Sequence, residues 1–190
     1  MSGYNQTLVT AQVDGTALTA STTPTSILPA NARLAIPANY FFIGKRLRIE
    51  ARGRMSTVTT PGTLTLTVNL GPTSNIVVFA PAALTLNATA TTNQTWWLEV
   101  AMTCRAVGSG TVTTFIGIGS FISRSLLNAP AVGTTLGVGV ALLPDTAPVV
   151  GGGCDNTVVN YLDLIATWSI NNADSIQVHE YAVTDLNFTP

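Results

Sequence analysis

The sequence predicts an all-β protein, an antiparallel β-sandwich or jelly roll of about eight strands with almost no helix. Two observations lead to this prediction. Apolar and polar residues alternate with a period of two along several short segments, as they do in half-buried strands. No segment combines a 3.6-residue apolar period with capping residues at both ends, as a helix would. The 190 residues suffice for one domain with a substantial core and are few for two.

The alternation is clearest in three segments. Leucine and valine alternate with threonine and asparagine in 63–70, and apolar residues alternate with arginine and glutamate in 46–55. The third such segment is 96–105. Prolines and glycines separate the candidates, and no period of 20 to 50 residues repeats, which argues against a propeller or solenoid. The eight or nine expected strands are Gln6–Gln12, Thr16–Ala20, Arg46–Met55, Thr63–Leu70, Asn75–Ala80, Trp96–Arg105, Thr111–Ser123, Val158–Ser169 and Ile176–Val183.

Residues 1–12 are expected to form an extended N-terminal arm and residues 13–190 a single β-sandwich domain. An extended arm is suited to adding a strand to the sheet of a neighbouring molecule. Two segments, 21–45 and 125–156, carry prolines and turn residues in place of clear alternation, and we expect long loops there. Long loops in a compact domain are usually functional or ordered by a partner, so loop 125–156 is expected to pack on a neighbour.

The surface is expected to be unusually poor in charge. Charged residues make up 9% of the chain, against roughly a quarter in an ordinary soluble domain. The net charge of −1 argues against a nucleic-acid binder. The uncharged stretches 55–98 and 125–144 are too polar or broken to span a membrane, and the N-terminus has no signal-peptide pattern. We therefore expect a soluble protein made in the cytoplasm, with its 30 threonines coating the surface and part of that surface buried in an assembly.

Residue types that catalysis or metal binding requires are scarce. The single histidine, His179, lies in a strand-like run, and no Gly-x-Ser-x-Gly elbow is present. Cys104 and Cys154 are expected to be free thiols, and with one histidine they do not supply a zinc site. The aspartates lack calcium-loop spacing, and the Gly-x-Gly pairs lack a strand–turn–helix context. We expect no enzyme activity, no metal and no cofactor, and a β-sandwich hydrolase is the least favoured reading.

The most informative local feature is a basic cluster. Five of the eight cations fall within ten residues, namely Lys45, Arg46, Arg48, Arg52 and Arg54. On a strand the four arginines share one face with Glu50. They are candidates for bidentate pairing with acids of a neighbouring strand or of a partner subunit. Alternatively, they form a solvated face balanced by cross-strand acids such as Glu99. No aromatic residues interleave with them, which disfavours nucleic acid.

Adjacent Trp96 and Trp97 face opposite sides of one expected strand. One of them is therefore expected in the core, and the sequence leaves open which. An outward Trp97 would be an interface anchor, because buried tryptophan and arginine dominate interface energetics. A sugar-stacking platform is the competing interpretation.

Four segments carry a resemblance to a known class: YNQTLVTAQVDGTAL, NYFFIGKRLRIEARGRMSTVTTPGTLTLTVNLG, WWLEVAMTCRAVGSGTV and IQVHEYAV. Over most of the chain the sequence resembles small virion proteins of tailed bacteriophages, which are similar to jelly-roll decoration (cement) proteins. The resemblance implies a homotrimer, made in the host bacterial cytoplasm, that binds the major capsid protein on the capsid exterior and stabilises the shell. The alternative is a head- or tail-fibre module that binds host surface glycan through Trp97 and loop 125–156.

Overall fold

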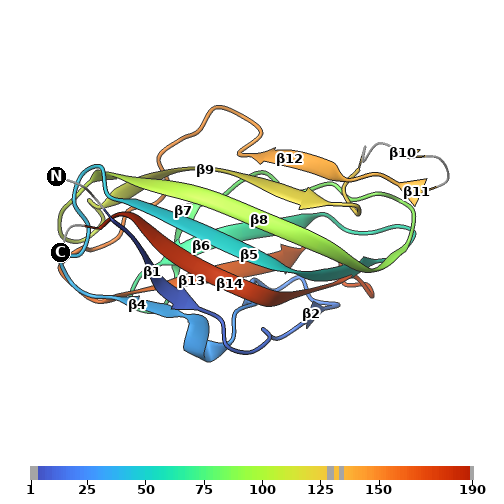
Figure 1. Ribbon diagram of the computed structural model, residues 1–190, viewed down its shortest axis with the longest axis horizontal. Coiled ribbons are helices and arrows are strands. Elements are labelled where there is room, and N and C mark those ends of the chain that lie inside the picture. Colours follow the sequence, from blue (N-terminus) through green and yellow to red (C-terminus); the bar gives the residue numbers. More distant parts are fainter. Residues whose placement is uncertain (1–3, 128–130, 133–134, 189–190) are drawn as a thin grey trace.

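The computed structural model describes residues 4–127, 131–132 and 135–188 and confirms the all-β prediction. Two antiparallel sheets pack face to face, and strands account for 55% of the residues (Figure 1). Within the described residues, the helical content is a single 3-10 turn, η1 (Ala30–Ala32). All nine expected strands are present.

The larger sheet has the strand order β1-β14-β5-β8-β9-β12, with β2 also paired to β14. Its strands are β1 (Tyr4–Thr10), β2 (Leu18–Thr19), β5 (Arg46–Thr57), β8 (Thr91–Ala106), β9 (Thr114–Ser123), β12 (Gly139–Leu143) and β14 (Ser175–Phe188). The smaller sheet has the order β3-β13-β6-β7, with β4 also paired to β13. Its strands are β3 (Thr25–Ser26), β4 (Leu34–Ile36), β6 (Leu64–Leu70), β7 (Ile76–Phe79) and β13 (Asn160–Trp168). A separate pair joins β10 (Ala131–Val132) to β11 (Thr135–Leu136).

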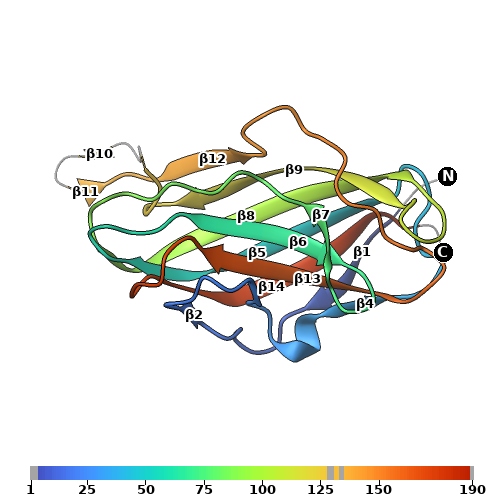
Figure 2. The same cartoon turned by 180° about the vertical axis from the view of Figure 1, so that it is seen from behind.

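Eight of these strands pair in a nested order. The first and last, β1 and β14, pair in the larger sheet, and the next two inward, β3 and β13, pair in the smaller one. Further inward, β5 pairs with β8 in the larger sheet and β6 with β7 in the smaller one. A long double-stranded ribbon wound across two sheets in this way is the jelly-roll arrangement. The segment between β8 and β13 adds β9 and β12 beyond it and widens the larger sheet (Figure 2).

The core lies between the sheets and follows from the alternation. In β5, every second residue from Leu47 to Thr57 is buried, and so is every second residue from Trp96 to Cys104 in β8 and from Leu64 to Val68 in β6. The largest fully buried side chains include Trp96, Trp168, Phe115 and Phe121. Trp96 stacks on Phe121 across β8 and β9, with ring centroids 5.8 Å apart. The apolar residues of these alternating patterns thus pack together in one shared core.

A β-bulge at His179 interrupts the alternation of β14. The pairing with β5 shifts register between Val178 and Glu180, so that Val178 and Tyr181 are both buried although they are three residues apart. Gly53 lies opposite the bulge, and a Cβ there would lie 1.9 Å from the backbone oxygen of Gln177. The close approach of the two strands therefore requires glycine at position 53.

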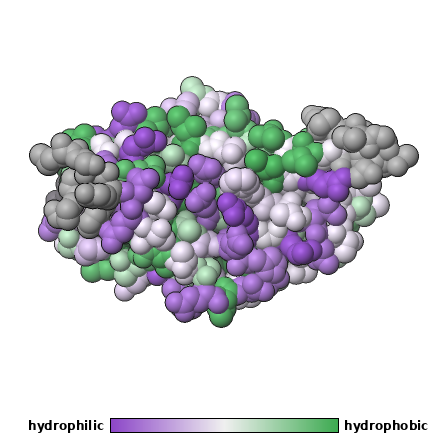
Figure 3. Space-filling view, in the orientation of Figure 1, coloured by the Kyte–Doolittle hydropathy of each residue, from purple (hydrophilic) through white to green (hydrophobic). Residues whose placement is uncertain are grey.

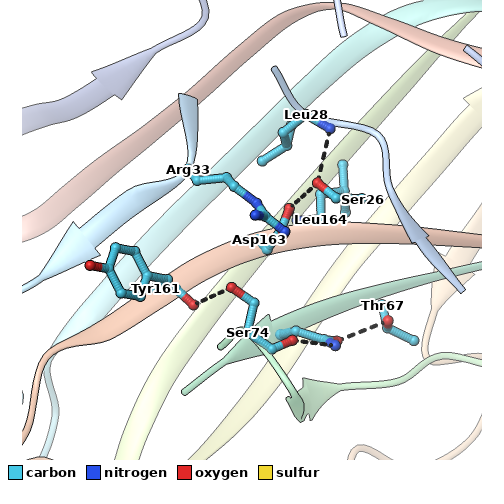
Figure 4. Close-up of polar contacts among 9 residues, drawn as sticks. Ser26, Leu28, Arg33, Thr67, Ser74, Tyr161, Asp163 and Leu164 are labelled. Carbon is cyan, nitrogen blue, oxygen red and sulfur yellow. Dashed lines mark hydrogen bonds and ion pairs between the residues drawn. The ribbon is translucent and has the colours of Figure 1, made fainter. Parts of the chain in front are cut away.

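Buried carboxylates fasten the irregular segments to the sheets. Asp163 of β13 accepts hydrogen bonds from the Ser26 hydroxyl (2.6 Å) and from Arg33 Nε (2.6 Å), which holds the segment from β3 to β4 against β13 (Figure 4). Asp174 is fully buried and accepts hydrogen bonds from the backbone N–H groups of Val58 and Gly62. Asp163 thus binds side chains of the segment that runs past β13, and Asp174 satisfies two backbone N–H groups of the segment between β5 and β6.

Part of the expected extended arm, residues 1–12, pairs within its own chain. Residues Tyr4–Thr10 form β1, which pairs with β14, and addition of this segment to the sheet of a neighbouring molecule stays a prediction. Leu8 and Val9 also pack against the core. The arm is the outermost strand of the nested ribbon, and β14 provides the sheet edge that it completes.

The two expected loops also contain strands. Segment 21–45 includes β3 and β4, which are too short to show alternation and form by pairing with β13. Segment 125–156 includes β12, which pairs with β9, and a bridge between Val150 and Ile116. Residues 128–130 and 133–134 of that segment lie outside the described residues. Its expected packing on a neighbouring molecule stays a prediction.

Removing residues 1–10 tests whether β1 belongs to the fold. Because Leu8 and Val9 pack against the core, their loss should lower the free energy of unfolding by about 2 kcal/mol. For a chain of this length that corresponds to a fall in Tm of roughly 4–8 °C. Thermal unfolding followed by circular dichroism measures it, and an unchanged Tm would show that β1 is dispensable.

Candidate interaction surface

The outer face of the larger sheet holds the four arginines of the basic cluster and Trp97, whereas Lys45 of that cluster is buried. Alternation along β5 buries the odd-numbered residues and turns the even-numbered ones outward. The four arginines of β5, here called the arginine row, therefore lie on one face with Glu50, as the spacing predicts: Arg46, Arg48, Arg52 and Arg54. Whether they contact a partner remains a prediction.

Arg52 is the most engaged member of the row. Its Nη1 lies 3.2 Å from Oε2 of Glu180 on β14, and its guanidinium carbon lies 4.5 Å from the centroid of the Trp97 ring on β8. The side chains of Arg52 and Glu180 are 46% and 69% exposed. An exposed ion pair of this kind contributes little to folding, about 0–1 kcal/mol. Arg52 therefore remains available for a partner.

The acids beside the row differ from the expectation. Arg48 Nε lies 3.6 Å from Glu50 Oε2 on the same strand. Glu99 lies directly across from Glu50 in the β5–β8 register, so two like charges face each other. Among the described residues, no ion pair involves Glu99. The expected balance by Glu99 is thus replaced by pairs with Glu50 and Glu180.

The two tryptophans divide as expected, and the structure decides which is buried. Trp96 is fully buried, and Trp97 is 37% exposed on the outer face. The guanidinium of Arg52 over the indole is a cation–π contact. The contact occupies one face of the indole ring.

Beyond Trp97 the same face becomes apolar. Trp97 pairs with Ile122, and Ile122 pairs with Val140 on β12. Four apolar residues of β9 and β12 form what we call the apolar stripe: Ile118, Ile122, Val140 and Leu142. Ile118, Val140 and Leu142 are 58%, 61% and 72% exposed. Figure 3 shows apolar side chains gathered along the upper part of this face and polar ones below them.

The stripe ends at an open sheet edge. Strand β12 is the last strand of the larger sheet, and it carries no charge. A groove of about 240 Å³ lies beside β12 and is lined in part by Leu84, Leu126, Leu127 and Leu142. Uncharged edge strands without protection readily pair with other chains. This edge lies next to the apolar stripe.

The apolar stripe was not anticipated from the sequence, although β9 carries the signal. Phe115 and Phe121 on one face alternate with Ile116, Ile118 and Ile122 on the other, so the strand is apolar on both faces. In a two-layer protein only one face of each sheet is covered. A strand that is apolar on both sides therefore indicates an exposed apolar surface.

Other reactive side chains do not assemble into a site. Nδ1 of His179 lies 2.9 Å from Oδ1 of Asp14. Burial raises the pKa of both cysteine thiols to about 11, so they remain protonated at neutral pH. Within the described residues, no cluster of three or more histidines, cysteines or acids is suited to a metal ion. None of the described helices has the length and apolar character to cross a membrane.

Comparison with known proteins gives no match, either to a family model or to a curated protein. The family suggested by the residues therefore remains a prediction, and the surface has to be interpreted from its own geometry.

The paired tryptophans provide a stability test. Trp96→Ala should lower the free energy of unfolding by about 3–5 kcal/mol because it removes a fully buried ring. Trp97→Ala should cost about 1 kcal/mol or less, mainly the contact with Arg52. Urea unfolding of the two variants measures both. Equal losses would contradict the assignment of Trp97 to an exposed surface.

Proposed function

We propose that this protein is a structural component of a bacteriophage particle that binds the major capsid protein on the outside of the capsid and stabilises the shell. The observation that carries the proposal is the outer face of the larger sheet. There Trp97 of β8 lies directly beside the apolar stripe, and the arginine row of β5 lies on the other side of β8. Contiguous exposed apolar surface rimmed by polar residues marks a protein interaction site.

The residue types on this face suit a protein partner. Arginine and tryptophan are enriched at the centres of interfaces, where they supply much of the binding energy. The apolar stripe loses no charge hydration when it is covered, so burying it costs little. A surface of this composition supports stable attachment to another protein rather than turnover of a substrate.

The fold adds support by analogy. Jelly rolls occur in viral capsid proteins and in lectins, so the architecture suits both the decoration protein and the glycan-binding fibre module. The contact of Arg52 with the Trp97 ring favours the first, because it occupies one face of the ring on which a sugar would stack. Self-association into a homotrimer is part of the same proposal.

Copy number in the virion tests the function. We expect quantitative mass spectrometry of purified particles to find this protein at a stoichiometry comparable to that of the major capsid protein. Purified protein should also bind shells prepared without it. A few copies per particle, or specific binding to a glycan array, would instead favour the fibre module.

Substitutions on the apolar stripe should abolish assembly without unfolding the chain. We expect the double variant Ile118→Asp, Leu142→Asp to lose shell binding or self-association, because both side chains are more than half exposed. Val13→Asp is the matched control, since Val13 is 58% exposed near the opposite edge of the sheet. Light scattering and cosedimentation with shells measure the effect. If both variants assembled and bound shells equally well, the apolar stripe would be excluded as the interaction surface.

The arginine row can be tested separately. Replacing Arg48 and Arg52 together with alanine should weaken assembly and leave the Tm nearly unchanged, because the two side chains are 38% and 46% exposed. A large fall in Tm with normal assembly would show that these arginines serve the fold alone.

A further inference from the structure

The single lysine of this chain is buried. Lys45 immediately precedes β5, and its side chain is 5% exposed. It forms an ion pair with Asp185 of the neighbouring strand β14, whose side chain is fully buried. Lysine is almost never fully buried unless it is paired. The cluster lies outside the apolar stripe and the arginine row.

The surroundings of this pair are aromatic and almost closed to water. The Lys45 ammonium lies 4.5 Å from the centroid of the Tyr40 ring and 5.2 Å from that of Phe42. The hydroxyl of Tyr40 donates to Oδ2 of Asp185 at 2.7 Å, and the backbone N–H of Asn187 donates to Oδ1 at 3.1 Å. The Lys45 nitrogen and the Asp185 carboxyl group are thus held together, and each carboxyl oxygen accepts a hydrogen bond from a further donor.

We propose that Lys45 and Asp185 condense into an isopeptide bond, a covalent amide crosslink between the start of β5 and the end of β14. A proton first passes from the ammonium to the carboxylate, which gives a neutral amine and a carboxylic acid. The Lys45 nitrogen then attacks Cγ of Asp185, a C–N bond forms, and one C–O bond breaks. The departing oxygen leaves as water, taking the acid proton and one amine proton, so no oxidant or other reactant is required.

Three features of the site favour this reaction. Burial penalises the two charges, and a neutral amide removes that penalty. Holding two reacting groups in contact raises their effective concentration to about 10⁵–10⁸ M, which offsets the unfavourable condensation of free acids with amines in water. Tyr40 supplies a donor to the oxygen shared with Lys45. Burial, followed by the hydrogen bond to Asp185, raises its pKa far above the usual value, so the hydroxyl stays protonated.

Intact mass spectrometry of the purified, denatured protein tests this directly. We expect a mass lower than that of the sequence by one water molecule. We also expect a branched tryptic peptide that joins the residues around Lys45 to the segment after Arg124. An intact mass equal to that of the sequence, with an ordinary cleavage after Lys45, would overturn the proposal.

The uniqueness of Lys45 allows a second readout. In denatured wild-type protein an amine-reactive reagent should label only the N-terminal amine, because the lysine nitrogen is already acylated. Asp185→Ala should gain a second label at Lys45, and Lys45→Arg should have the mass of its own sequence, since a guanidinium does not condense. The wild-type result stands even if either variant folds poorly. The outcome is independent of the proposed capsid role.

Discussion

The structure depends on one constraint: the strands at the centre of the larger sheet must satisfy two opposite surroundings. In β5 the odd-numbered residues enter the core, and the even-numbered ones carry four of the eight cations of the chain. The inward side chains hold the two sheets together. Because the side-chain period of a strand is two, the same pairing that fixes the core also fixes the spacing of the outer face. Core and surface are therefore specified together.

Alternation was enough to predict the sandwich and the shared face of the arginines, because those features depend on local pattern alone. Features that depend on partners in space were missed. The pairing of β1 with β14 connects the two ends of the chain, and β3 and β4 form only against β13. The register that sets Glu99 against Glu50 is a tertiary property as well. Trp96 and Trp97 have the same side chain, so only the orientation of β8 relative to the core decides which of the two is buried.

The nested pairing of eight strands explains where the uncovered apolar surface arises. The ribbon itself ends its larger sheet at β8, and β9 and β12 extend that sheet further. The inner face of β9 is still covered, since Phe115 and Phe121 are buried, but on its outer face Ile118 is 58% exposed. Covering those residues by another protein would remove apolar surface from water without dehydrating a charge. The extension is thus the part of the fold that gains most from assembly.

The cations of the chain also differ between the surface and the interior. The surface cations are all arginines, which suit planar pairing and stacking at interfaces. The one lysine is buried between the start of β5 and the end of β14, where its amine pairs with the carboxylate of Asp185. Those two strands also carry Arg52 and Glu180 on the outer face. The proposed covalent bond between Lys45 and Asp185 would therefore join the start of the strand that carries Arg52 to the end of the strand that carries Glu180.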